Sequence, residues 1–275
     1  MKNIARSLCD KASELISSGT DGVSLSLTIT TVLDEFIRDI FEQTGRGKVE
    51  GISLVAIGGY GRREMAPFSD IDIMFLVKER SPRSEETAKE ILYRLWDTGL
   101  TVGHSFRTLG DCVEEGMKEI QTRTALMESR FLAGDRMVFE EFRRDVFQRI
   151  LYKNRKEFLG EVMRENDKRQ AAYGGSVYLL QPNLKEGRGG LRDIHTISWL
   201  SRVSFMGVTP PGNPLRLMKA HEFLLLTRAS LHLISGRRND ILSFELQEGV
   251  SRMLGLKDTR RFLSSEIMMR LLYRK

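Results

Sequence analysis

Two aspartates separated by one residue stand at the head of an apolar run in the segment VAIGGYGRREMAPFSDIDIMFLV, residues 55–77. In a β-strand, residues i and i+2 point to the same face, so Asp70 and Asp72 are expected to project together. Adjacent carboxylates repel each other, and one pKa rises unless a cation lies between them. Their oxygens suit Mg²⁺, whose coordination is usually completed by substrate phosphates. The pair therefore predicts a magnesium site, although a turn-capping Asp70 and a strand-edge Asp72 would give the same pattern.

Glycines upstream of the aspartates are typical of a phosphate site. Gly58 and Gly59 let backbone N–H groups approach a phosphate with no Cβ in the way. Residues 60–64 can form a short helix whose N-terminus favours an anion. Arg62 is a further candidate phosphate ligand, and Ser69 is expected either to bind phosphate or to cap the turn before the strand.

A second glycine-rich segment, NLKEGRGGLRDI, occupies residues 183–194. It combines a flexible turn with positive charge at the start of a helix, which suits a second contact to a nucleotide. The candidate nucleotide-binding residues here are Lys185, Gly189, Gly190, Arg192 and Asp193. The alternative is a loop that packs one domain on the other, with Asp193 paired to Arg192 or another base.

An apolar residue, Gly-Gly, a spacer and Asp-x-Asp together resemble the signature of the nucleotidyltransferase superfamily. Further segments match one family more closely: LWDTGLTVGHSFRTLGDC, ALMESRFLAGD and LQPNLKEGRGGLRDIHTISWL follow GGYGRREMAPFSDIDIMFLV in this order. Together they resemble the N-terminal half of the bacterial PII-protein uridylyltransferases, and the similarity spans nearly the whole chain. The glutamine synthetase adenylyltransferases share the first motif but match less well through VGHSFRT.

This resemblance implies a polymerase-β-like α/β nucleotidyltransferase domain with a small mixed sheet, followed by an all-helical domain. It implies transfer of UMP from UTP to a tyrosine hydroxyl of the PII signalling protein, in nitrogen regulation. Asp70 and Asp72 would hold Mg²⁺, and Gly58, Gly59 and Arg62 would contact the triphosphate. Family members continue into HD phosphohydrolase and ACT domains. No histidine here precedes an aspartate, so we expect either part of a longer protein or a short paralogue.

Many superfamily members carry a third carboxylate on the next strand, as metal ligand or general base. The strand expected over residues 100–109, LTVGHSFRTL, has no acid. His104 is a candidate base because its ordinary pKa is near neutral. A structural histidine bonded to a neighbouring loop is the alternative interpretation.

Apolar periodicity predicts the elements that position these residues. Strands are expected within residues 51–59, 69–77 and 100–109. Helices are expected over residues 4–18, 28–43, 81–99, 124–135 and 136–168, from 191 onward, and over 213–236 and 247–273. The predicted organisation is N-terminal helices over residues 1–48, a nucleotidyltransferase domain over 49–130 and a helical domain over 131–275.

Composition limits the other classes of function. The 275 residues are 41% hydrophobic and carry a net charge of +6, with no apolar run long enough for a membrane span. Cys9 and Cys112 fit no disulfide or metal spacing, so a cytoplasmic protein is expected. Basic residues are interspersed with acidic ones, which makes nucleic acid an unlikely partner. Transfer of AMP to a protein and a non-catalytic nucleotide-binding regulator stay open as alternatives.

Overall fold

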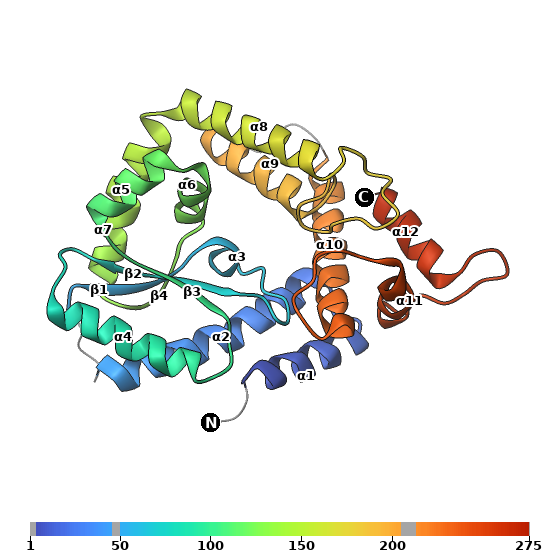
Figure 1. The fold of residues 1–275 in the computed structure, drawn as a ribbon, viewed down its shortest axis with the longest axis horizontal. Helices are drawn as coiled ribbons and strands as arrows, with labels where there is room; N and C mark the ends of the chain where they lie inside the picture. The colour runs from blue at the N-terminus through green and yellow to red at the C-terminus, as the bar shows by residue number, and fades with distance from the viewer. Residues whose placement is uncertain (1–3, 46–49, 205–212, 275) are drawn as a thin grey trace. The chain divides into compact units, whose positions relative to one another are not determined.

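The computed structural model describes residues 4–45, 50–204 and 213–274, and Figure 1 shows their elements. They form two compact units that interleave along the sequence. The first unit comprises Met1–Ser7, Thr30–Met65 and Ser69–Phe158, and the second comprises Leu8–Ile29, Ala66–Phe68 and Leu159–Lys275. This division differs from the predicted domains 1–48, 49–130 and 131–275, because the first unit extends to Phe158 and the second takes up two earlier segments.

The first half of the chain contains both helices and short strands. In the described part of the second half, the regular elements are all helices. In chain order the elements are α1 (Ile4–Ser17), α2 (Gly22–Gly45), β1 (Ile52–Ala56), α3 (Gly58–Gly61), β2 (Ile71–Val77), α4 (Pro82–Trp96), β3 (Val102–Thr108), α5 (Leu109–Lys118), α6 (Ile120–Met127), β4 (Arg130–Gly134), α7 (Arg136–Phe147), the π-helix η1 (Gln148–Tyr152), α8 (Arg155–Ala172), α9 (Leu191–Ser204), α10 (Pro214–Ser235), α11 (Phe244–Met253) and α12 (Ser264–Arg274).

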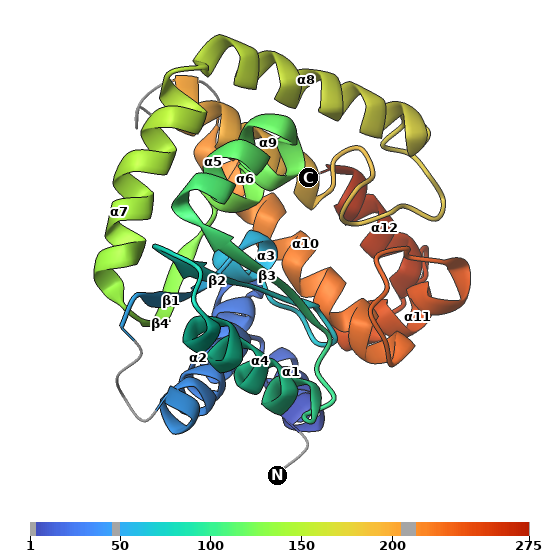
Figure 2. The same cartoon turned by 60° about the vertical axis from the view of Figure 1, so that its left-hand side comes forward.

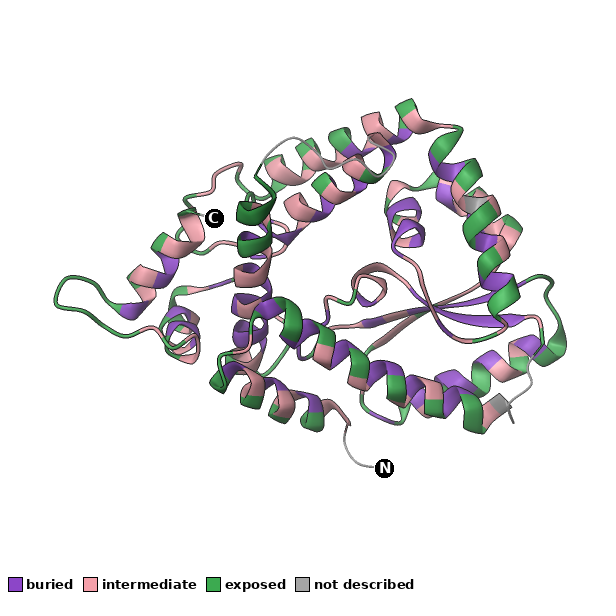
Figure 3. Ribbon diagram, turned by 180° about the vertical axis from the view of Figure 1, so that it is seen from behind, coloured by how far each residue is buried: buried purple, intermediate pink, exposed green. Residues whose placement is uncertain are grey.

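A four-stranded mixed sheet in the order β3-β2-β1-β4 forms the centre of the first unit. Strand β1 is antiparallel to β2 and β4, whereas β2 is parallel to β3. Every residue of β1 is buried, and so is every residue of β2 except Asp72 (Figure 3). Their continuous apolar runs suit strands covered on both faces. The predicted α/β domain with a small mixed sheet, followed by a helical region, is confirmed.

Helices cover both faces of this sheet (Figures 1 and 2). On the face that carries Asp72 and Met74, Cys112 of α5 lies with its Sγ 3.7 Å from Met74 Sδ. On the opposite face, the ring of Trp96 in α4 packs edge-on against His104 at 5.7 Å between centroids. His104 therefore points away from the face of Asp72, which argues against the hypothesis that it is the general base at that carboxylate.

The prediction of a helix over residues 124–135 is wrong in its second half. Helix α6 ends at Met127, and Arg130–Gly134 form the edge strand β4 beside β1. Arg130 donates two hydrogen bonds to Asp34 of α2, at 2.6 and 2.9 Å. The extended conformation of β4 depends on its pairing with β1 and on this contact with α2, which are both distant in the sequence. The local spacing of apolar residues therefore did not indicate a strand.

A hydrophobic core holds the second unit together, and its residues come from helices α9 to α12 and from the segments before α9 and α11. Its buried members are Leu184, Leu191, Leu224, Leu225, Leu231, Leu242, Val250, Met268 and Met269. Gly22, the first residue of α2, lies against α10 so closely that a Cβ there would come within 2.6 Å of the Leu226 nitrogen. Within the described ranges no helix is both long enough and apolar enough to cross a bilayer.

Candidate functional site

Strand β2 carries Asp72, whereas Asp70 precedes its first residue. The strand begins at Ile71, whose amide donates to the Thr101 carbonyl at 2.8 Å. Phe68, two residues before Asp70, has a φ of 62°, so the chain turns through the left-handed region just ahead of the strand. The expectation that both aspartates lie in the strand is wrong for Asp70. Alternation along the strand therefore fixes the direction of Asp72 alone.

The carboxylate of Asp72 lies between two glycines. Asp72 and Gly103 are direct partners in the parallel register of β2 and β3. A Cβ on Gly103 would lie closer than 3.0 Å to Asp72 Oδ1, a separation that real side chains do not show. A Cβ on Gly58 would lie 3.7 Å from Asp72 Oδ2. The missing side chain at Gly103 therefore makes the room that the carboxylate occupies.

The motif Gly58-Gly59-Tyr60-Gly61 forms the single turn α3 directly after β1. Gly58 has a φ of 57°, a conformation that favours glycine. Gly61 serves packing, because a Cβ there would overlap the Glu128 carbonyl oxygen at the end of α6. The predicted short helix over residues 60–64 is displaced: the helical turn begins at Gly58, next to Asp72, and ends at Gly61.

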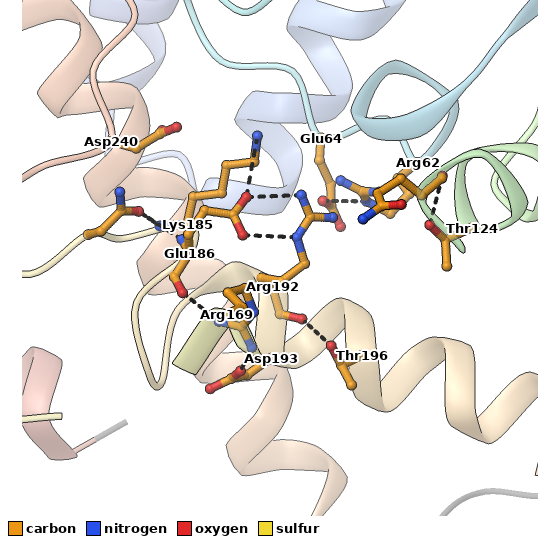
Figure 4. Close-up of polar contacts among 12 residues, drawn as sticks. Arg62, Glu64, Thr124, Arg169, Lys185, Glu186, Arg192, Asp193, Thr196 and Asp240 are labelled. Carbon is orange, nitrogen blue, oxygen red and sulfur yellow. Dashed lines mark hydrogen bonds and ion pairs between the residues drawn. The ribbon is translucent and has the colours of Figure 1, made fainter. Parts of the chain in front are cut away.

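Arg62 is held by two carboxylates of its own unit. Its Nε donates to Glu64 Oε2 at 2.8 Å, as the right-hand group in Figure 4 shows. Its Nη1 pairs with Glu128. Burial disfavours the charge, but Glu128 and Glu64 raise the pKa of Arg62 above its ordinary value. This guanidinium is committed to an internal ion-pair network, which its position in the motif did not indicate.

A buried pair supports the same turn from the sheet side. Arg130 lies with its guanidinium 5.3 Å from the ring centre of Tyr60 and donates to the Tyr60 carbonyl at 3.2 Å. Burial, with the charge of Asp34, raises the pKa of Tyr60. Arg130 therefore has a structural role here.

The second glycine-rich segment belongs to the second unit and is closed by its own hydrogen bonds. The side chain of Asn183 accepts from the amides of Lys185 and Glu186, at 3.0 and 2.7 Å. Asp193 accepts from the Gly189 amide at 2.7 Å and pairs with Arg169 of α8. These bonds fix the loop before α9 begins.

The charged side chains of this segment have partners inside the unit (Figure 4). Arg192 donates two hydrogen bonds to Glu186, at 2.9 and 3.2 Å, and Lys185 Nζ lies 3.9 Å from the same carboxylate. Burial, with Arg228 and Arg192 nearby, lowers the pKa of Lys185. Asp193 therefore pairs with a base other than Arg192, and the contacts described here all lie within the second unit. A nucleotide contact stays a prediction.

Two glycines of this segment, Gly187 and Gly190, border backbone. A Cβ on Gly187 would lie 2.6 Å from the Asn183 carbonyl oxygen. A Cβ on Gly190 would lie 2.8 Å from the Leu184 carbonyl oxygen. These residues are glycines because the loop folds tightly on itself.

The predicted site residues thus form two groups, one in each unit. Asp70, Asp72, Gly58, Gly59, Arg62 and Ser69 belong to the first unit, and Lys185, Gly189, Gly190, Arg192 and Asp193 to the second. Sequence reasoning missed Gly103. The signal was an isolated glycine inside a strand pattern, which often marks a close approach of another group.

Comparison with known proteins identifies relatives for both units. Residues 36–123 match the family model of the nucleotidyltransferase domain, and residues 157–275 match that of the GlnD PII-uridylyltransferases. Three similar proteins are each named bifunctional uridylyltransferase/uridylyl-removing enzyme. The one from Caulobacter vibrioides is 35% identical over 90% of this chain, that from Azospirillum brasilense 37% over 86%, and that from Cereibacter sphaeroides 40% over 81%. The aligned regions cover 28%, 26% and 25% of those relatives.

Proposed function

Because the chain carries the nucleotidyltransferase domain and the adjoining region of the PII-uridylyltransferase family, we propose that it transfers UMP from UTP to a protein. The acceptor we propose is a tyrosine hydroxyl on a PII-type signalling protein, and pyrophosphate is the second product. The names of the similar proteins support this assignment. We place the reaction in the cytoplasm, because Cys9 and Cys112 are both free thiols.

The observation that carries the proposal is the placement of Asp72. Its carboxylate lies beside Gly58 and against the position that Gly103 leaves open. Gly58 is also the residue at which the chain turns, with a positive φ, into α3. A carboxylate is thereby set next to backbone that a phosphate can approach closely.

The donor set fits a magnesium ion held by Asp70 and Asp72. Both side chains are half-buried, and both offer the hard oxygen atoms that this ion prefers. When bound, the ion would neutralise triphosphate charge and stabilise the leaving pyrophosphate.

The protein must also align the acceptor tyrosine with the α-phosphate of UTP. A tyrosine hydroxyl has a pKa near 10 and is a weak nucleophile at neutral pH, so alignment is decisive. Its oxygen bonds to the α-phosphorus of UTP while the bond to the β-phosphate oxygen breaks, and the phenol proton passes to water. Gly58 and Gly59 admit the phosphates, and the exposed Arg63 adds positive charge next to Arg62.

The test uses nucleotide labelled at the α-phosphate. The protein is incubated with Mg²⁺, UTP or ATP, and a PII protein from the same source, and label on PII is measured. We expect transfer from UTP, its loss in the Asp70→Asn/Asp72→Asn variant, and little transfer from ATP.

A matched control replaces two exposed aspartates, Asp10 and Asp167, by asparagine. It removes the same charge from the protein but leaves the site intact, so its transfer should equal that of the unaltered chain. Preferred transfer from ATP would replace UMP by AMP in the proposal. Absence of transfer from both nucleotides, with nucleotide still bound, would overturn the enzymatic proposal for this chain.

A further inference from the structure

The segment that leads into Asp70 is anchored in the helical unit. Ala66–Phe68 belong to the second unit, whereas the residues on either side, up to Met65 and from Ser69, belong to the first. Both ends of this connection are conformationally demanding, since Arg63 and Phe68 adopt φ values of 64° and 62°. A non-glycine residue in this region persists only when its surroundings hold it there.

The holding contact comes from His232 in the last turn of α10. Its side chain is fully buried, at 0% exposure, and its Nδ1 lies within hydrogen-bond distance of the Pro67 carbonyl oxygen. A carbonyl oxygen only accepts, so Nδ1 carries the proton and donates. A bond between residues 165 positions apart in the chain thus fixes the carbonyl directly before Phe68.

Asp240 lies on the other side of the imidazole. Its Oδ1 lies 3.5 Å from His232 Nε2 and accepts a hydrogen bond from Arg228 Nε at 2.6 Å. Its backbone carbonyl accepts from the Leu184 amide at 2.8 Å, next to Lys185. The same residue therefore lies beside His232 and is bonded to the glycine-rich loop before α9.

We propose that His232 is a positioning residue for Asp70. The imidazole ties Pro67 to α10, holds the left-handed turn at Phe68, and so sets where the chain delivers Asp70 at the start of β2. This role rests on the proposed function, because it matters for activity only if Asp70 serves the transfer reaction. In this proposal His232 acts through the chain segment that it holds and not by contact with the reacting groups.

Three substitutions of His232 distinguish the role of Nδ1 from that of Nε2. In His232→Asn the amide nitrogen stands near the position of Nδ1 and can still donate to Pro67. In His232→Gln it stands near Nε2 and reaches toward Asp240 instead, and His232→Leu keeps volume but no donor. The exposed Met218 of the same helix provides the control Met218→Ala.

The first measurement is hydrogen exchange in the protein without substrates. Peptides covering residues 64–72 should exchange about tenfold faster in His232→Leu and His232→Gln than in the unaltered chain or in His232→Asn. Unchanged exchange in all three variants would overturn the proposal without touching the proposed function. Rescue by Gln and not by Asn would overturn it too, since the ring would then act through Asp240.

The second measurement is transfer of UMP under the conditions above. His232→Leu should lower kcat between about 10- and 100-fold with a smaller change in KM, as expected for displaced catalytic groups. His232→Asn should recover most of the loss, and Met218→Ala should show none. Faster exchange in His232→Leu with unchanged kcat would show that the turn is held by His232 but that Asp70 does not depend on it, which contradicts the proposal.

Discussion

The chain contains two glycine-rich segments, and they use their glycines differently. Around β2, Gly58 and Gly103 border the carboxylate of Asp72. Before α9, Gly187 and Gly190 border the carbonyl oxygens of their own loop. A side chain added at Gly58 or Gly103 meets the end of another side chain, whereas one added at Gly187 or Gly190 meets backbone.

The two kinds of neighbour predict different consequences of substitution, one for activity and one for stability. A carboxylate can rotate away from an intruding methyl group, so the fold survives but the carboxylate is displaced. Backbone in a closed loop has no such freedom, and the strain falls on the folded state. Substitution of Gly103 should therefore reduce activity, and substitution of Gly187 or Gly190 should reduce stability.

The largest expected effect is on the carboxylates themselves. Asp72→Asn should lower the rate of transfer by more than about 100-fold. Mutation of a residue that only supports a metal ligand already lowers metal affinity or activity about 10- to 100-fold, and loss of the ligand itself should cost more. Asp193→Asn, the matched change in the second segment, keeps an acceptor for the Gly189 amide and should lower transfer no more than about threefold. Rates of labelled transfer measure both. An equal loss in the two variants would place the second segment in the catalytic site.

Next in size is the effect of filling the space beside Asp72. Gly103→Ala should lower transfer about 10- to 100-fold while the unfolding midpoint stays close to that of the unaltered chain, since Asp72 Oδ1 must move. Gly110→Ala, in the first turn of α5, is the control, because a Cβ there lies 3.6 Å from Thr108 Oγ1, an ordinary contact. Full activity in Gly103→Ala would show that the position of this carboxylate is not critical.

The second region should respond in stability. Gly187→Ala should lower the free energy of unfolding by about 1–3 kcal/mol, because the methyl group meets the Asn183 carbonyl. Urea unfolding measures this change. Gly160→Ala in α8, where the neighbour is the flexible end of Arg164, should be neutral or stabilising. If Gly187→Ala unfolds at the same urea concentration as the unaltered chain, the loop is looser than its hydrogen bonds indicate.

The smallest expected effect is the loss of folding stability at acidic pH. Burial alone would raise the pKa values of Glu186 and Asp240. Contact with Arg192 lowers the pKa of Glu186, and contacts with His232 and Arg228 lower the pKa of Asp240. A carboxyl group with a lowered pKa stabilises the fold above its ordinary pKa, 4.5 for Glu and 3.8 for Asp, and this stability is lost as the pH falls below those values. Urea midpoints should therefore drop in this acid range. In Glu186→Gln the drop should be shallower, and an unchanged slope would exclude Glu186 as a contributor.

The sequence predicted much of the first region because its signals are local. Apolar runs marked β1 and β2, and the spacing of Asp70 and Asp72 indicated carboxylates near a phosphate turn. Where a strand begins is not local, however. Asp70 falls outside β2 because the ladder starts with the bond from Ile71 to Thr101.

Contacts between distant residues account for the other differences. Arg62 looks available in the motif, but its partner Glu128 lies 66 residues away. The role of Gly103 depends on the register between β2 and β3, which no local pattern encodes. Strand β4 was mistaken for helix because its extended conformation depends on pairing with β1.

The close approach of Gly22 to α10 also sets an order of events during synthesis. Glu222, the residue of α10 that Gly22 lies against, leaves the ribosome about 200 residues later, or roughly 10–40 s at ordinary elongation rates. The four strands of the sheet are complete by Gly134, well before that time. The nascent chain can therefore assemble its sheet first, while Leu8–Ile29 wait for the helices they will join. Leu8, Ala12 and Ile16, which are buried in the folded protein, should stay more exposed to solvent during this interval.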